Sequence, residues 1–404
     1  MTRIKENTIT FLKWICVSVI IGIILGFLGY LFHIALDFVT EIRTGNMYLV
    51  WFLPIAGVVI FGVYKICKME NNKGTNCVIM SVRKEDKPPL VLTPLIFIST
   101  VITHLFGGSA GREGAALQMG GSVGYFVGSK LKLDEKDKTT ATMCGMSGAF
   151  SALFGTPVTA SVFAMELTNV GIMQYSVIVP CVLCAVTGRL IVQGLGVLPT
   201  LYKVLSFPQL SATTVLKTVA LGILCAVVSK IFCMVLQKTH TLYEKYIPNK
   251  IVAGVVGGLI VAVLTFALGT GDYNGAGTQI IDKAISGEAE IYAFALKILF
   301  TAITLGAGFK GGEIVPTLFI GATFGCTVSP LLGLSPSFGA SVGMISLFCG
   351  VTNCPLSALV MSVELFGGQG LALYMVAVAV SYLLSGYQGL YSSQKIIYSK
   401  TKME

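Results

Sequence analysis

The segment Gly108-Ser-Ala-Gly-Arg-Glu-Gly114 is matched 200 positions later by Gly308-Phe-Lys-Gly-Gly-Glu313. In both segments the glutamate lies between a glycine-rich turn and an apolar run. The similarity continues beyond these segments, because the Gly-Met pair at 145–146, the Pro-Val-Thr-Ala run at 157–160 and the Glu-Leu pair at 166–167 have counterparts 198 positions later. The sequence therefore predicts two homologous halves, residues 1–205 and 206–404.

The composition excludes a water-soluble globular protein. Of the 404 residues, 54% are hydrophobic and 12% are charged, and the mean hydropathy is +0.82. Soluble domains carry about 25% charged residues. Apolar runs at 14–39, 48–67, 218–236 and 251–268 are close to or longer than the ~20 residues that cross a bilayer as a helix. We therefore expect an all-α integral membrane protein with many spans.

Four other apolar stretches are interrupted by Gly and Pro at short intervals. They are residues 105–128, 145–165, 305–325 and 341–365. Irregular backbone at membrane depth persists only where it is buried in protein or lines a cavity. The sequence therefore predicts tilted and broken helices that meet inside the membrane, as in transporters built from inverted repeats.

Basic residues are distributed unequally between equivalent loops of the two halves. Residues 65–90 contain six Lys or Arg, whereas residues 268–290 contain one. The loops at 41–48 and 238–250 show the opposite bias, with one and three basic residues. Because basic loops face the cytoplasm, the halves should cross the membrane in opposite senses, with both termini cytoplasmic. Such loops also account for the net charge of +9 without a nucleic-acid partner.

Four glutamates fall within the interrupted stretches: Glu113, Glu166, Glu313 and Glu364. An ionisable group at membrane depth costs free energy and is usually retained for function. Glu166 and Glu364 are equivalent in the repeat, and each closes a helix expected to begin at a proline. A symmetric cap on a helix end is the simpler explanation for that pair, whereas we expect Glu113 and Glu313 to be functional.

Glu113 and Glu313 adjoin the predicted starts of two helices. A helix N-terminus offers unpaired N–H donors and about half an elementary positive charge, which suits an anion. Pro316 fits the first turn of the second helix, where a missing N–H costs nothing. Two interpretations of Arg112 and Lys310 remain open. In the first they raise the local positive potential further; in the second they only extend to the membrane surface or pair with an acid.

A carboxylate at an anion site is itself an anion. Glu113 occupies such a site when it is ionised and leaves it when it is protonated. Competition between an anion and a proton for one position is the minimal requirement for coupled antiport.

Two further polar elements are candidates for the ion path. In Gly74-Thr-Asn-Cys-Val78, Thr75 or Asn76 offers a side-chain donor, although an ordinary helix cap is the simpler explanation. Tyr391 follows the last apolar span and offers a phenolic O–H, although an isolated tyrosine more often lies at the membrane interface. The three histidines are scattered, and no nucleotide-binding loop or catalytic triad is present, so we expect no metal, no cofactor and no enzymatic activity.

These motifs resemble those of the CLC family of chloride channels and anion/proton antiporters. Gly111-Arg-Glu-Gly114 is similar to the family's GREGP element, with Ala115 in place of proline. Residues 311–316 are similar to its GxFxP element, with Ile314 in place of phenylalanine. Tyr391 falls at the family's anion-coordinating tyrosine, and the resemblance covers nearly the whole chain.

Within the family, the sequence is most similar to the bacterial fluoride-exporting branch. Residues 308–313, the Gly111-Arg-Glu-Gly-Ala run and Phe154-Gly-Thr-Pro157 look like that branch, and residues 74–78 take the place of GSGIP. The branch lacks the inner proton-transfer glutamate of the chloride antiporters, and that position is Leu167 here. In its place the branch has a central glutamate, which corresponds to Glu313.

The resemblance implies fluoride/proton exchange, with Glu113 as the outer gate and Glu313 on the ion or proton route. The candidate anion-binding residues are Thr75, Asn76, Arg112, Gly114, Ile314, Val315 and Tyr391. It also implies a homodimer in the cell membrane with one pathway per subunit, and we expect no soluble regulatory domain. The alternatives are a chloride/proton antiporter or chloride channel of the same fold and, more remotely, a membrane enzyme that uses the two glutamates as acid and base.

Overall fold

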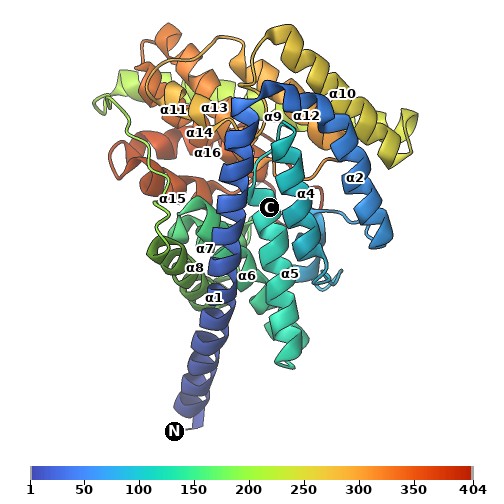
Figure 1. The fold of residues 1–404 in the computed structure, drawn as a ribbon. Coiled ribbons are helices and arrows are strands. Elements are labelled where there is room, and N and C mark those ends of the chain that lie inside the picture. The colour runs from blue at the N-terminus through green and yellow to red at the C-terminus, as the bar shows by residue number, and fades with distance from the viewer. Residues whose placement is uncertain (1, 402–404) are drawn as a thin grey trace.

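The computed structural model describes residues 2–401, and the chain is almost entirely helical (Figure 1). The α-helices are α1 Thr2–Gly45, α2 Leu53–Ile66, α3 Thr75–Val82, α4 Leu92–Leu105, α5 Glu113–Lys130, α6 Glu135–Phe154, α7 Pro157–Glu166, α8 Ile178–Gly194, α9 Ala212–Tyr246, α10 Lys250–Leu268, α11 Thr278–Ile285, α12 Ala293–Gly306, α13 Ile314–Val328, α14 Pro336–Thr352, α15 Pro355–Phe366 and α16 Leu371–Leu384. The short elements are the 3₁₀ helices η1 Met47–Phe52, η2 Tyr175–Val177 and η3 Ser329–Leu332 and the strands β1 Asn169–Val170 and β2 Lys395–Ile396. Apart from the two dipeptide strands, the predicted helical fold is confirmed.

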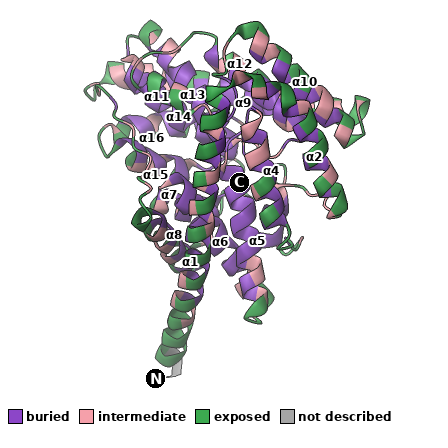
Figure 2. Cartoon of the chain, in the orientation of Figure 1, coloured by how far each residue is buried: buried purple, intermediate pink, exposed green. Residues whose placement is uncertain are grey.

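Six helical stretches of the described chain are long and apolar enough to cross a bilayer. They are Ile4–Gly45, Met47–Ile66, Tyr175–Gly194, Ala212–Tyr246, Lys250–Leu268 and Ile314–Leu332. Three of the four predicted spans fall within them, and the remaining one, 48–67, extends one residue beyond Met47–Ile66. The 44 residues of α1 make a helix about 66 Å long at 1.5 Å per residue, and its N-terminal end projects from the molecule (Figure 1). Large apolar side chains of α1, including Phe27, Leu31 and Phe38, are at least half exposed, as lipid contact requires (Figure 2).

Each of the four interrupted stretches contains a break between helices, as predicted. The breaks are residues 106–112 before α5, 155–156 between α6 and α7, 307–313 before α13 and 353–354 between α14 and α15. Gly155 and Asn353 end α6 and α14 in the left-handed conformation, with φ of 80° and 59°. Pro157 and Pro355 then begin the next helices. These two breaks are therefore built in the same way at equivalent positions of the repeat.

Glycines bring the central helices into backbone contact. A Cβ added to Gly120 of α5 would lie 2.1 Å from the carbonyl oxygen of Gly145 in α6. A Cβ added to Gly321 of α13 would lie 2.4 Å from the carbonyl oxygen of Gly343 in α14. Because small residues let membrane helices approach closely, α5–α6 and α13–α14 form two similar tightly packed pairs.

The breaks before α5 and α13 meet in a short antiparallel bridge. The N–H of Gly111 donates to the carbonyl oxygen of Gly312, and the N–H of Gly312 donates to that of Gly111, both at 2.7 Å. Both glycines are buried. Because a buried backbone group without a partner costs free energy, the reciprocal bonds allow two irregular segments to cross deep inside the protein.

Glu166 and Glu364 cap the N-termini of two other helices. Glu166, the last residue of α7, accepts hydrogen bonds from the backbone N–H groups of Leu356 at 3.0 Å and Ser357 at 2.9 Å, in the first turn of α15. Glu364 of α15 accepts bonds from two first-turn amides of α7, at 2.9 and 2.7 Å. These amides have no intrahelical acceptor, and the positive end of the helix favours a carboxylate. The helix-cap interpretation of both glutamates is confirmed, and the caps are exchanged between α7 and α15.

Removal of one exchanged cap should destabilise the fold. We expect Glu364→Ala to lower the free energy of unfolding by about 1–2 kcal/mol, because two helix-start amides lose their acceptor, and Glu364→Gln to have a smaller effect. Thermal unfolding of the detergent-solubilised protein measures both, with Glu290→Ala, a change at an exposed glutamate, as the control. A Glu364→Ala protein as stable as Glu290→Ala would contradict the cap role.

Candidate functional site

α5 and α13 both begin beside the glycine bridge with unpaired backbone donors. Intrahelical bonding starts with the N–H of Ala116, which donates to the carbonyl of Arg112 at 3.0 Å, and with that of Thr317, which donates to the carbonyl of Glu313 at 3.0 Å. The N–H groups that precede these bonds have no intrahelical acceptor. Together with the partial positive charge of each helix start, they form an environment suited to an anion.

Gly114 and Gly312 allow the two helix starts to touch. A Cβ on Gly114 would lie 2.8 Å from Gly312 Cα and 3.2 Å from the Oε2 atom of Glu313. A Cβ on Gly312 would lie 2.4 Å from the backbone nitrogen of Gly114. Neither position accepts a side chain without a backbone shift. Glycine at both positions therefore allows the start of α5 to lie next to the side chain of Glu313.

Glu113 is the first residue of α5 and is only 1% exposed. Its Oε2 accepts a hydrogen bond from the N–H of Arg112 at 3.1 Å. Its Oε1 lies 3.6 Å from Arg112 Nε and has no hydrogen-bond partner among the described residues. Glu113 lines a cavity of about 130 Å³, here called the Glu113 cavity. Other residues that line it include Asp37, Arg43, His104, Arg112, Tyr202 and Val315.

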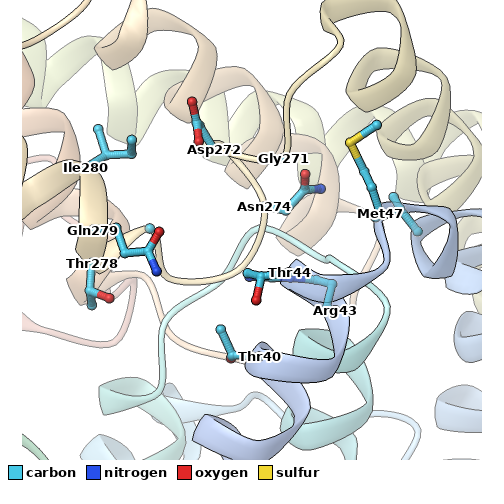
Figure 3. A pocket seen from close by; sticks show the side chains of 12 residues that line it. Thr40, Arg43, Thr44, Met47, Gly271, Asp272, Asn274, Thr278, Gln279 and Ile280 are labelled. Atoms are coloured by element: carbon cyan, nitrogen blue, oxygen red, sulfur yellow. The ribbon is translucent and has the colours of Figure 1, made fainter.

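A second pocket shares lining residues with the Glu113 cavity. Its volume is about 280 Å³, and it lies between the end of α1 and the segment that leads into α11 (Figure 3). Thr40, Arg43, Gly277 and Thr278 line both spaces. Arg43 is 7% exposed, and its guanidinium donates to the backbone oxygen of His104 at 3.4 Å. The two spaces therefore share a wall and lie next to each other, and a passage between them would make this pocket the outlet of the Glu113 cavity.

Glu313 lines a different cavity, of about 340 Å³, here called the Glu313 cavity. Its Oε2 atom is buried and has no hydrogen-bond partner within the described chain. Thr75 and Tyr391 line the same cavity, and the buried hydroxyl of Tyr391 is likewise without a partner in residues 2–401. The two glutamates therefore stand next to the bridged glycines but open into separate spaces.

Thr75 is the first residue of α3 and reaches the backbone of α5. Its hydroxyl donates to the carbonyl of Gly114 at 3.4 Å and accepts from Gln118 Nε2 at 3.3 Å. Gln118 Nε2 also lies 3.3 Å from the carbonyl of Gly114. The N-cap of α3 is Gly74, which makes no side-chain capping bond. The helix-cap interpretation of Thr75 and Asn76 is therefore wrong, because glycine occupies the cap and both side chains turn to other segments.

Asn76 holds the C-terminal segment, although it also lines the Glu313 cavity. Its Oδ1 accepts from the N–H of Ser393 at 3.0 Å and from the Ser393 hydroxyl at 2.5 Å. Two residues earlier, Tyr391 is only 3% exposed. The interpretation of Tyr391 as an interface tyrosine is therefore wrong, because the anchored tail carries its ring into the protein interior.

An ionic cluster ties the same tail to the end of α3. Glu85 accepts from Arg83 at 2.9 Å and from Lys395 at 2.6 Å, and Arg83 also donates to the carbonyl of Ser393. The parallel pairing of β2 with β1 adds a second anchor. The hydrogen bonds from Arg83 and Lys395 lower the pKa of Glu85 to about 2. The cluster thus stays ionised well below neutral pH, and only a fall in pH toward that value removes it.

The remaining candidates occupy different surroundings. Arg112 and Val315 line the Glu113 cavity, whereas Ile314 is fully buried and lines neither cavity. Lys310 lines the Glu313 cavity, and its ammonium lies 4.6 Å from the centre of the Tyr64 ring, a distance typical of a cation–π contact. Arg112 pairs with acids, which is one of the options left open, whereas Lys310 packs on an aromatic ring, which was not among them.

Sequence analysis missed two buried polar residues near the site. Gln118 stands four positions after Gly114 and therefore lies on the same face of α5; a polar residue inside an apolar run was the available signal. Lys297 is fully buried in α12 and donates to the carbonyls of Tyr273 at 3.1 Å and Gly275 at 2.7 Å. A lysine in the middle of an apolar helix was the signal there.

Known proteins are similar to this chain in sequence. The family model for voltage gated chloride channels matches residues 56–386. A chloride/fluoride channel protein of Pseudomonas syringae pv. tomato is 33% identical over 395 residues, which cover 96% of this chain and 87% of that protein.

Solved structures give the same result. The crystal structure of a CLC-type fluoride/proton antiporter superposes with a TM-score of 0.92 at 30% identity and covers 95% of this chain and 98% of that one. A slow cyanobacterial Cl⁻/H⁺ antiporter has the same fold, with a TM-score of 0.80 at 18% identity and coverage of 92% and 94%. The chain therefore belongs to the CLC family of chloride channels and anion/proton antiporters.

Proposed function

We propose that the protein is a fluoride/proton antiporter that exports fluoride from the cytoplasm. The observation that carries the proposal is the pair of glutamates at the two helix starts. Each has a carboxylate oxygen without a hydrogen-bond partner among the described residues, and each opens into its own cavity. The 30% identity to a fluoride/proton antiporter of known structure and the 33% identity to a chloride/fluoride channel protein support fluoride as the anion.

Glu113 serves as the gate. In its ionised form the carboxylate is held by the N–H of Arg112 and by the positive start of α5, where it takes the place of a transported anion. Protonation removes the charge, so the attraction weakens and the side chain gives up the position. Fluoride from the Glu313 side then enters the position that Glu113 has left. Glu113 releases its proton toward the Glu313 side, and the ionised carboxylate returns and displaces fluoride toward the Glu113 side, so the two ions move in opposite directions.

The Glu313 cavity supplies donors to the other end of the path. Thr75 and Tyr391 contribute hydroxyl groups, and the backbone from Gly114 and from Ile314 to Val315 contributes amides at the two helix starts. Fluoride is small and strongly hydrated, so short hydrogen bonds must replace its water shell. Because hydrogen fluoride is a weak acid, a protonated Glu313 is a suitable donor to fluoride, and it can also pass its proton along the route.

The two halves, residues 1–205 and 206–404, cross the membrane in opposite senses in this proposal, with both termini cytoplasmic. The positions of the cavities support it. Asn72 and Lys73, from the most basic loop, line the Glu313 cavity, which then opens to the cytoplasm. The pocket at the outlet of the Glu113 cavity is lined by Met47 and Gly271 from loops poor in basic residues, and it opens outside. The assembly is a homodimer in the cell membrane, with one pathway per subunit.

Removal of the ionisable gate should abolish coupling. In liposomes loaded with fluoride, the wild-type protein should release fluoride to an electrode while a pH-sensitive dye reports proton uptake. We expect Glu113→Gln to reduce fluoride-driven proton uptake by roughly 100-fold, the scale on which proton transfer by a placed side chain acts. Glu290→Gln, which changes an exposed glutamate, should leave both fluxes unchanged.

Three results would count against this proposal. Chloride release as fast as fluoride release would replace the assignment by a chloride/proton antiporter or a chloride channel. Proton coupling that persists in Glu113→Gln would place the gate elsewhere. No flux of either anion through the wild-type protein would reject the transport function.

Thr75 should affect anion preference. Deletion of one hydroxyl donor in Thr75→Ala should change the ratio of fluoride to chloride flux by about two- to tenfold, since one hydrogen bond contributes ~0.5–1.5 kcal/mol. Ser81→Ala is the matched control, because Ser81 is buried on the same helix and its hydroxyl donates within that helix to Val78. An unchanged ratio in Thr75→Ala would give Thr75 a purely structural role.

A further inference from the structure

Arg112, the cation in contact with Glu113, is held in place by α1. Arg112 Nη1 lies 2.9 Å from His33 Nδ1 and 3.9 Å from an oxygen of Asp37. His33 Nε2 lies 3.1 Å from the other oxygen of Asp37. We call His33, Asp37 and Arg112 the α1 clamp. Since Arg112 Nε lies 3.6 Å from Glu113 Oε1, the clamp connects two residues of a lipid-facing helix with the gate.

The contacts determine which nitrogen of His33 carries the proton. A guanidinium has only donors, so His33 Nδ1 must accept from Arg112 and is unprotonated. Nε2 then carries the proton and donates to Asp37. In an imidazolium both nitrogens carry protons, so a protonated His33 loses its bond to Arg112 and repels the guanidinium charge.

We propose that the α1 clamp positions the gate's counter-charge: neutral His33 holds Arg112 against Glu113, and protonated His33 releases it. The inference rests on the proposed role of Glu113 as the gate. An opposite charge within about 4–6 Å favours the ionised form of a carboxyl group. Release of Arg112 therefore lets Glu113 keep its proton up to a higher pH. Acid on the Glu113 side thus acts on the gate through His33 as well as directly.

The surroundings of the clamp allow this role. Asp37 lines the Glu113 cavity and its side chain is 62% exposed, whereas that of His33 is 20% exposed, so protons in the cavity reach His33 through Asp37. The other titratable or charged groups of the Glu113 cavity are Arg43, His104 and Tyr202. No ion pair joins any of them to Glu113 within the described residues, and His104 Nδ1 is occupied by the carbonyl of Thr100 at 2.9 Å. Arg112 is therefore the cation through which a change at His33 reaches the gate.

Two substitutions of His33 separate positioning from structure. In His33→Asn the side-chain oxygen replaces Nδ1 as an acceptor but does not titrate, whereas His33→Leu offers no acceptor. Fluoride-driven proton uptake is measured in liposomes while the pH on the Glu113 side is varied at fixed pH on the other side. We expect His33→Leu to move the pH profile toward higher pH by about one unit. His33→Asn should keep the wild-type rate of proton uptake at neutral pH. At acidic pH it should lack the part of the rate change that protonation of His33 causes in the wild type.

A double-mutant cycle and a matched control complete the experiment. In an Arg112→Gln background His33→Leu should cause no further shift, because the group through which it acts is absent. Asp37→Asn should produce a smaller shift than His33→Leu. Glu41→Gln removes an exposed carboxylate one turn further along α1, at a residue that forms no ion pair in the described chain, and should leave the profile unchanged.

An unshifted profile in His33→Leu, or a uniform loss of rate at every pH, overturns the proposal. If the wild type exchanges fluoride for protons and Glu113→Gln abolishes coupling, that result rejects the clamp alone and leaves the proposed function intact. A second readout needs no transport: nitrogen NMR of the histidine-labelled wild type, with His33→Leu used to assign the signal. The clamp requires neutral His33 to carry its proton on Nε2, and a proton on Nδ1 overturns it.

Discussion

The reciprocal hydrogen bonds between Gly111 and Gly312 determine where the two helix starts meet, and the site depends on that contact. Two irregular segments cross inside an apolar protein, and each must satisfy its backbone without water. By pairing with each other they bring α5 and α13 to one place. Gly114 then lies so close to the other segment that a Cβ on it would be 2.8 Å from Gly312 Cα and 3.2 Å from Glu313 Oε2. A side chain at either crossing point would separate the two sets of amides that make the region suitable for an anion.

The four buried or partly buried glutamates of the repeat divide into two kinds. Each carboxylate oxygen of Glu166 and Glu364 accepts a hydrogen bond from a backbone N–H of the other helix, so these two residues hold α7 and α15 together. Glu113 and Glu313 each keep one oxygen without a hydrogen-bond partner in the described structure. A buried polar atom without a partner is costly, and protonation lowers that cost. A protonated carboxyl group can then donate to an anion, which the two capping glutamates are not placed to do.

Much of this arrangement could be predicted from local pattern. The broken helices and the presence of glutamate caps follow from Gly, Pro and Glu at fixed spacings, because each of those residues constrains its own few neighbours. The exchange of the caps between α7 and α15 does not, since Glu166 and the amides that it caps are 190 and 191 positions apart. Thr75 and Tyr391 line the Glu313 cavity, and the alternatives of a helix cap and an interface tyrosine were wrong. Those alternatives failed because Gly74 occupies the cap and because the tail is anchored to Asn76.

Other contacts lay beyond sequence reasoning because they join distant segments. Gln118 meets Thr75 across 43 positions, and Arg112 meets His33 across 79. No local sequence period or composition predicts these contacts. They arise from the packing of α1 and α3 against α5. The single base of the loop at 41–48, Arg43, likewise proved to be buried between the Glu113 cavity and the neighbouring pocket rather than exposed in a loop.

The claim that an anion and a proton compete for the position of Glu113 has a direct equilibrium test. Fluoride is added to the detergent-solubilised protein in weakly buffered solution, and the change in pH is recorded against a fluoride-free addition of the same salt concentration. If fluoride displaces an ionised carboxylate that then takes up a proton, the solution becomes more alkaline as fluoride binds. Fluoride binding that takes up no protons from the solution would contradict the competition on which the whole account depends.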